Sequence, residues 1–147
     1  LPFTVDKVES IYSLRVSDRN IEITPVSVGN PHAVHKVDSL DDDYVTTIGK
    51  ALESHGRFPH NVNVGFMQIL NRSEIRLRVY ERGVGETQAC GTGACAAVVA
   101  GIKQGWLDSN VVAHLNGGDL KIEWQGDGAS ILMTGPAAKV FEGQIYL

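Results

Sequence analysis

The sequence predicts an α+β fold in which a mixed, mostly antiparallel sheet rolls around one central, buried hydrophobic helix. Several short segments alternate apolar and polar residues with the period of two that is typical of half-buried strands. By contrast, the stretch from Gly93 to Ile102 is apolar on all sides. A helix without a polar face must be surrounded by protein. The 147 residues are 43% hydrophobic, which is enough for one domain with a real core, and we expect residues 1–147 to form a single domain.

Short strands account for most of the predicted structure. In one of them Ile75, Leu77 and Val79 alternate with arginine and tyrosine, so one face is buried. Gly-rich or Asp-Gly turns such as Gly126-Asp127-Gly128 separate the segments. The expected strands cover residues 14–16, 21–24, 75–80, 120–124, 131–133 and 140–147.

Two helices are predicted between these strands. The first runs from about Asp42 to His55, with acidic residues at its start, an apolar stripe, and Gly56 as a stop signal. This pattern is typical of an amphipathic surface helix. The second begins near Gly91 and ends near Gln104, and it contains the apolar stretch described above.

Charge and cysteine content exclude several classes of protein. The 13 basic and 17 acidic residues give a net charge of -4, whereas a nucleic-acid-binding protein normally has a basic face. The longest apolar stretch, residues 94–102, is far shorter than the roughly 18 residues that a membrane span needs. Cys90 and Cys95 lie about 7.5 Å apart if helical, too far for a disulfide, and their spacing is not that of a metal site. Two reduced thiols indicate a cytoplasmic protein.

The start of the buried helix is the candidate site. Backbone N–H groups at a helix N-terminus are unpaired and partly positive, so Gly91 and Thr92 can hold a carboxylate. The same groups are expected to lower the pKa of Cys90 and favour its thiolate. A Gly-rich turn that merely contains a cysteine is the alternative, but the adjoining Glu81-Arg82 pair and the glycine spacing favour a site. Cys95, one turn later, is expected to be a small core residue.

Other polar residues leave structural and functional interpretations open. Asn30 can form a turn or offer its amide to a ligand. The side chain of Asn63, flanked by two valines, faces either a site or an exposed strand surface. His32 can carry a proton or be solvated, and the extended spacing places His32 and His35 on opposite faces.

Four segments together resemble the diaminopimelate epimerase family, in the same order along essentially the whole chain. They are Gly-Asn-Pro-His at 29–32, Asn-Val-Asn-Val at 61–64, Glu-Arg-Gly-x-Gly-Glu-Thr-x-Ala-Cys-Gly-Thr-Gly at 81–93, and Gly-Pro-Ala at 135–137. The long third motif is specific. Cys-Gly-Thr-Gly alone is not, because proline-racemase-like proteins carry a similar segment.

The resemblance implies an isomerase that interconverts LL- and meso-diaminopimelate, in lysine and peptidoglycan precursor biosynthesis, without a cofactor or a metal. Two similar lobes face each other across a cleft in this family, and each contributes one cysteine that adds or removes the α-proton. Carried onto this chain, Cys90 is one acid/base thiol, and His32 and Glu81 tune the cysteine pKa values. The substrate would be bound by Asn30, Asn63, Glu81, Arg82, Gly91 and Thr92.

The chain departs from the family in length, because a full epimerase is nearly twice as long and carries its other cysteine in the first lobe. We therefore expect a second lobe that is inactive alone and whose partners are the small-molecule substrate and the missing N-terminal lobe. Residues 136–147 are expected to pack on that first lobe. The full-length protein is expected to form a homodimer and to bind neither nucleic acid nor membranes.

Two other functions remain open from the sequence. A related cofactor-independent amino-acid racemase, similar to proline racemase, would keep Cys90 and its glycines but would not need Asn30, Asn63 and Arg82 together. A non-catalytic lobe would serve only for dimerisation or binding, and its Cys90 would react like an ordinary thiol.

Overall fold

One mixed sheet and two helices make up the described part of the chain, residues 9–137 and 139–147 of a computed structural model. The strands are β1 (Tyr12–Val16), β2 (Arg19–Ser27), β3 (Pro31–Val37), β4 (Asn63–Asn71), β5 (Glu74–Glu81), β6 (Gly85–Thr87), β7 (Asn110–Leu115), β8 (Gly118–Glu123) and β9 (Leu132–Thr134). The helices are α1 (Asp42–Glu53) and α2 (Gly91–Lys103).

The strands pair mostly with antiparallel neighbours, as predicted. The hydrogen-bonded order is β1-β2-β3-β4-β5-β7-β8-β9, and β6 pairs with β5 at the side of this path. Within the described residues, β3–β4 and β5–β7 are the parallel pairs. Both helices occur where the sequence predicted them, and α1 ends two residues earlier than expected.

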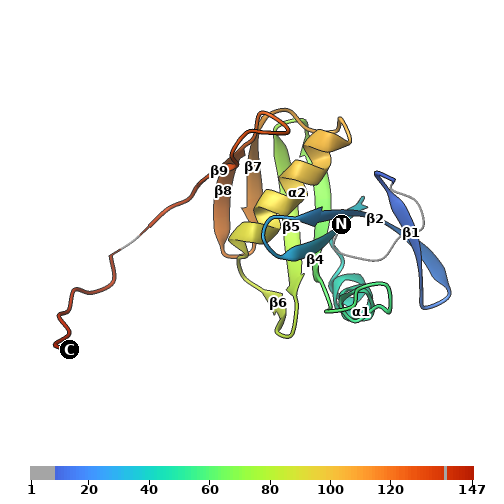
Figure 1. The fold of residues 1–147 in the computed structure, drawn as a ribbon, viewed down its shortest axis with the longest axis horizontal. Helices are drawn as coiled ribbons and strands as arrows, with labels where there is room; N and C mark the ends of the chain where they lie inside the picture. Colours follow the sequence, from blue (N-terminus) through green and yellow to red (C-terminus); the bar gives the residue numbers. More distant parts are fainter. Residues whose placement is uncertain (1–8, 138) are drawn as a thin grey trace.

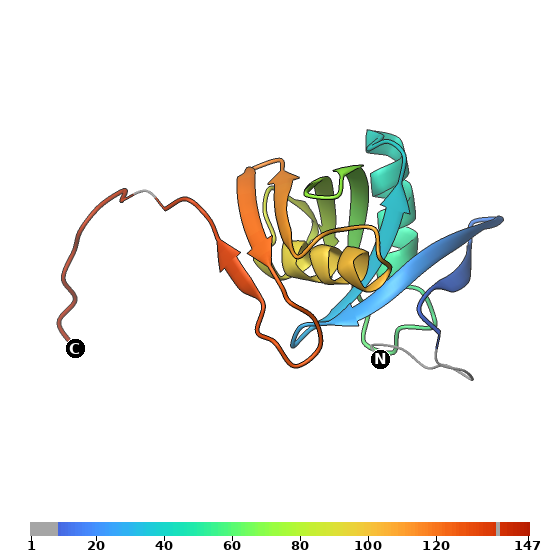
Figure 2. The ribbon, with the colours of Figure 1, turned by 90° about the horizontal axis from the view of Figure 1, so that it is seen from above.

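Helix α2 lies in the hollow of the curled sheet (Figures 1 and 2). Its residues from Gly93 to Gly101 are buried apart from Cys95. They pack on apolar side chains of β4, β5, β7 and β8, including Met67, Leu77 and Ile122. Cys95 is half-buried and also packs against this core, as expected for a small core residue.

Helix α1 covers part of the opposite face of the sheet and forms a second core. Asp41 caps the helix by accepting a 2.9 Å hydrogen bond from the backbone N–H of Tyr44. Val45, Ile48 and Leu52 form the buried side of α1 and pack with side chains of β1 to β4. Among the described residues, no helix is long and apolar enough to cross a membrane.

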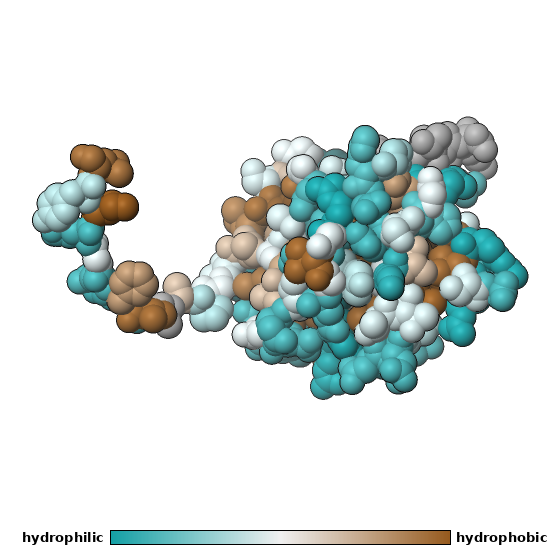
Figure 3. Space-filling view, turned by 90° about the horizontal axis from the view of Figure 1, so that it is seen from below, coloured by the Kyte–Doolittle hydropathy of each residue, from teal (hydrophilic) through white to brown (hydrophobic). Residues whose placement is uncertain are grey.

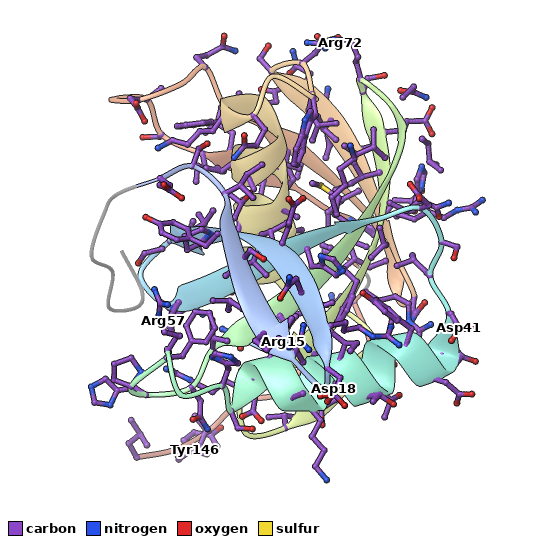
Figure 4. All side chains as sticks on the ribbon, turned by 90° about the vertical axis from the view of Figure 1, so that its right-hand side faces the viewer. Arg15, Asp18, Asp41, Arg57, Arg72 and Tyr146 are labelled. Atoms are coloured by element: carbon purple, nitrogen blue, oxygen red, sulfur yellow. The ribbon has the colours of Figure 1, made fainter. Side chains whose placement is uncertain are left out.

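The hairpin of β1 and β2 extends the second core. Its two-residue turn, Ser17-Asp18, has positive φ angles of 45° and 65°, as a type I′ turn requires. Figure 4 shows Arg15 and Asp18 on this hairpin, in front of α1. Leu14, Val16 and Ile21 turn their side chains to the core.

The predicted strand at 140–147 is wrong, because none of these residues pairs with the sheet. The chain after Thr134 leaves the body of the molecule, and Figure 3 shows apolar side chains along this tail. Phe141 and Tyr146 are 84% and 90% exposed. The strands β3, β4, β6 and β7 lie outside the predicted strand ranges. β7 nevertheless alternates buried Val111, Ala113 and Leu115 with more exposed residues.

Gly101 of α2 lies close to Leu107 in the core around that helix. This contact predicts the effect of adding a side chain at Gly101. A Cβ atom there would lie 2.7 Å from Cγ of the buried Leu107. We expect Gly101→Val to destabilise the fold by about 1–3 kcal/mol in urea denaturation. Gly56→Val, at an exposed turn where a Cβ meets nothing within 4 Å, is the control and should stay within about 0.5 kcal/mol. Equal effects at the two positions would contradict this packing account.

A second prediction concerns His114 on β7, which lies between two carboxylates. Its Nδ1 is 2.8 Å from Asp119 and its Nε2 is 3.0 Å from Glu74. These hydrogen bonds, that to Glu74 first, raise the pKa of His114 above its ordinary 6.5. Protonated His114 therefore stabilises the fold fully below pH 6.5, and this contribution is lost as the pH rises through the higher folded-state pKa. His114→Gln should remove this part of the pH dependence of unfolding; an unchanged dependence would contradict the assignment.

Candidate active site

The candidate site lies at one edge of the sheet, where four elements meet. The parallel strands β3 and β4 begin at this edge, and β5, which runs antiparallel to β4, ends there. The register pairs His32 with Asn63 across β3 and β4. Helix α2 starts at the same edge. The topology thereby brings together polar residues from segments that are far apart in the sequence.

Cys90 is the N-cap of α2. Its backbone is extended, with φ -142° and ψ 104°, and its Sγ accepts a hydrogen bond of 3.3 Å from the N–H of Gly93. The thiol thus takes the place that a serine or aspartate oxygen occupies at most helix starts. The Oγ1 of Thr92 lies 3.6 Å from the same sulfur atom.

Close contacts surround two glycines in the helix start, most tightly at Gly93. A Cβ on Gly93 would lie 2.9 Å from Val79 and 3.1 Å from Sγ of Cys90. A Cβ on Gly91 would lie 3.1 Å from the methyl group of Met133 on β9. The glycines therefore allow the helix start to approach β5 and β9 and let the Cys90 sulfur reach the backbone N–H.

Asn30 connects the start of β3 with the start of α2. Its Nδ2 donates to Thr92 Oγ1 at 3.3 Å, and its Oδ1 lies 3.0 Å from Nε2 of His32. With this amide orientation His32 must carry its hydrogen on Nε2. Burial and then the positive charge of Arg82 lower the pKa of His32 to about 4, so the ring is neutral at physiological pH.

Asn63 holds the end of β5 against the start of β3. Its Oδ1 accepts a 2.8 Å hydrogen bond from the backbone N–H of Arg82, and its Nδ2 donates to the carbonyl of Pro31 at 3.2 Å. Asn63 is 7% exposed, so its side chain does not lie on an exposed strand surface. The Arg82 side chain is exposed and donates to the carbonyl of His60 at 3.3 Å.

Glu81 lies at the end of β5, on the face that meets the start of α2. Its Oε1 accepts a 2.8 Å hydrogen bond from Thr87 Oγ1. Burial, as the largest effect, and also the negative charge of Glu81 raise the pKa of Cys90. The hydrogen bonds from Thr92 and Gly93 lower it but do not compensate. The expected low pKa of Cys90 is therefore wrong for this lobe, because the thiol is half-buried at an otherwise favourable helix start.

All eight predicted site residues lie at this edge, and the structure adds residues that were not predicted. Thr87 contacts Glu81, and Met133 covers Gly91. The N–H of Gly117 donates to the carbonyl of Gln88 at 2.7 Å and holds the segment that leads to Cys90. The pairing of β5 with β6 places Thr87, the pairing of β8 with β9 places Met133, and the turn after β7 places Gly117. Within the described residues no three His, Cys, Asp or Glu side chains are grouped as metal ligands.

The best-formed groove of the described residues lies away from the candidate site. It has a volume of about 930 Å³, is lined by residues including Glu22, His35 and Trp106, and contains none of the predicted site residues. His32 and His35 indeed point to opposite faces, since His35 contacts Tyr44 of α1.

Comparison with known sequences gives a consistent result over the whole chain. A family model described as diaminopimelate epimerase matches residues 24–140. Curated proteins of that name from Chromobacterium violaceum and Ectopseudomonas mendocina are 58% and 55% identical to this chain over all 147 residues. In both cases the match covers 53% of the relative. The chain thus spans about half the length of the curated relatives it matches.

Two solved structures that share this fold are distant in sequence. A hydroxyproline epimerase from Agrobacterium vitis, with bound trans-4-hydroxy-L-proline, has a TM-score of 0.59 at 16% identity. The similarity covers 90% of this chain and 46% of that one. A Bacillus anthracis phenazine biosynthesis protein of the PhzF family has a TM-score of 0.56 at 17% identity, over 77% of this chain and 38% of that one. These likenesses confirm the predicted α+β fold.

The environment of Cys90 predicts how its reactivity depends on pH. Iodoacetamide reacts with the thiolate, so the alkylation rate follows the pKa of the thiol. We expect the midpoint for Cys90 in this chain to lie above 9.0, the ordinary value. Thr92→Val should raise it further, because the variant loses a hydrogen bond to the sulfur. Peptide mass spectrometry separates Cys90 from Cys95, and a midpoint below the ordinary value would contradict the assignment.

Proposed function

Because this chain belongs to the diaminopimelate epimerase family, we propose that it is the second lobe of an enzyme that interconverts LL- and meso-diaminopimelate. The reaction removes the α-proton and returns one to the opposite face without a cofactor. The observation that carries this proposal is the thiol of Cys90 at the N-terminus of α2, with Asn30, Glu81 and Thr92 around it. The enzyme would act in the cytoplasm, in the synthesis of lysine and peptidoglycan precursors.

Cys90 is one of the two acid/base groups in this proposal. An α-proton next to a carboxylate is very weakly acidic, so its removal requires fixed dipoles that stabilise the developing negative charge. The free N–H groups of Gly91 and Thr92 at the start of α2 are such dipoles, and they would bind the substrate α-carboxylate. A thiol with a raised pKa is protonated at neutral pH and ready to deliver a proton. To act as a base, its pKa must fall when the cleft closes.

The other polar residues would hold the distal amino-acid end of the substrate. Arg82 supplies an exposed guanidinium, and Glu81 a carboxylate in the same region. Asn63 uses one lone pair and one hydrogen in its structural contacts and keeps one of each for a ligand. Asn30 would complete this set. His32 is neutral and connects to Thr92 through Asn30, so it would tune the thiol through hydrogen bonds rather than through a charge.

The second acid/base group must come from outside this chain. Base and acid have to stand on opposite faces of one carbon atom, and Cys95 is committed to the helix core. We propose that the missing first lobe supplies the second cysteine and that residues 136–147 pack on it. The exposed apolar side chains of Phe141, Ile145 and Tyr146 support this placement. The full-length protein would form a homodimer.

The test is α-proton exchange in heavy water, followed by NMR with LL- and meso-diaminopimelate. This chain alone should give no exchange, whereas mixing it with the first lobe as a separate chain should give epimerisation. Cys90→Ala in the mixture should lower the rate by about 10³-fold or more, because general acid–base catalysis at this position is lost. Cys95→Ala is the matched control and should leave the rate almost unchanged.

Three outcomes would contradict the proposal. Exchange by this chain alone would mean that one thiol both removes and returns the proton. An active Cys90→Ala mixture would exclude Cys90 as an acid/base group. Turnover of proline but not of diaminopimelate would indicate a related racemase instead.

A further inference from the structure

The hydrogen bond between Thr87 and Glu81 has no role in the mechanism proposed above. The two residues stand diagonally across the β5–β6 pair, whose register matches Val79 with Thr87 and Glu81 with Gly85. Diagonal neighbours lie on the same face of a sheet. An ionised carboxylate can only accept, so the partly buried Thr87 hydroxyl donates to Glu81 Oε1 at 2.8 Å.

Strand β6, which carries Thr87, is itself firmly anchored. The neighbouring Glu86 points to the opposite face, where its Oε2 accepts a 2.8 Å hydrogen bond from Arg78 Nη2. Arg78 also donates to Oε1 of Glu86 and, at 2.7 Å, to Asp42 in the first turn of α1. The Arg78 side chain is only 12% exposed. Asn116, in the turn after β7, donates to Glu86 at 3.2 Å.

This anchoring fixes the position of the Thr87 hydroxyl. Successive residues of a strand point to opposite faces, so holding Glu86 on one face determines where Thr87 lies on the other. On that face Val79 meets the start of α2, since a Cβ on Gly93 would lie 2.9 Å from it. Glu81 lies two residues further along the same face of β5 and so faces the helix start that carries Cys90. The contacts thus run from Arg78 through β6 to Thr87 and Glu81, beside the start of α2.

We propose that Thr87 is a positioning residue whose hydroxyl holds the Glu81 carboxylate against the Cys90 thiol. The inference deepens the proposed function and rests on it for its catalytic meaning. A carboxylate fixed beside the sulfur accepts the S–H and favours the protonated thiol, which is the form that delivers a proton. Without the Thr87 hydroxyl, Glu81 is free to turn away from Cys90, and the thiol loses this partner.

The groups that face Cys90 come from two elements. Thr92 and the Gly93 N–H belong to α2, and Glu81 belongs to the end of β5. The charges of Arg82 and Glu81 act on the neighbouring His32, which stays neutral. Among these groups, Glu81 is the one with a negative charge, and this charge raises the pKa of the Cys90 thiol. Moving the carboxylate away from the sulfur should therefore lower that pKa.

The experiment measures alkylation of Cys90 by iodoacetamide against pH in this chain, read by peptide mass spectrometry. Glu81→Gln should lower the midpoint of the profile, and Thr87→Val should lower it in the same direction by about half a pKa unit. Thr87→Ser keeps the hydroxyl and should leave the profile unchanged. In the Glu81→Gln background, Thr87→Val should add no further shift, because the residue acts only through Glu81.

Controls separate this effect from loss of structure. Thr46→Val makes the same substitution at an exposed position of α1 and should leave the profile unchanged. If Thr87→Val does not fold, as judged by circular dichroism, Thr87→Ala removes the same hydroxyl with a smaller side chain. An unshifted midpoint in the folded Thr87 variant, or an equal shift with and without Glu81, would overturn the inference.

The alkylation profile does not depend on epimerase activity, so the two proposals can fail separately. Coupled shifts at Thr87 and Glu81 support the positioning role even if mixing with the first lobe gives no epimerisation, an outcome that would overturn the proposed function alone. Epimerisation together with uncoupled titration would overturn the role of Thr87 alone.

Discussion

The burial of α2 is the constraint on which the rest of the structure depends. An apolar helix with no polar face has to be enclosed, and the sheet curls to enclose it. Enclosure leaves the helix start at the sheet edge, with backbone N–H groups that need partners. The sulfur of Cys90 meets one of them. The thiol at the candidate site is thus also the cap of the helix that forms the core.

The residues around the thiol combine structural and chemical roles. Asn63 ties Arg82 to the start of β3, and Asn30 links β3 to α2. Each side chain keeps hydrogen-bonding capacity beyond these contacts. The elements that meet here, β3, β4, β5 and α2, are separated by long stretches of sequence. The arrangement of the site therefore depends on how the strands pair with one another. Side chains held by such contacts are preorganised, so a ligand would meet them with little rearrangement.

The sequence predicts those features that depend on local pattern. The amphipathic α1 and the alternating β5 follow from periodicity, and α2 follows from an apolar stretch that begins with glycines. The direction of the Cys90 pKa could not be predicted, since the half-burial of its thiol and the nearby Glu81 depend on the fold. The link between Thr87 and Glu81 requires the register of β5 and β6. Residues 140–147 have the composition of a strand, but composition does not supply a pairing partner.

The position of the tail has a consequence for the order of events during synthesis. Both cores use residues no later than Ile131, and the last strand ends at Thr134. Because synthesis runs from the N-terminus, every side chain of the two described cores is made before residues 139–147. Neither core needs these last residues in order to form. The exposed apolar side chains of the tail are thus surplus to the packing of the described residues.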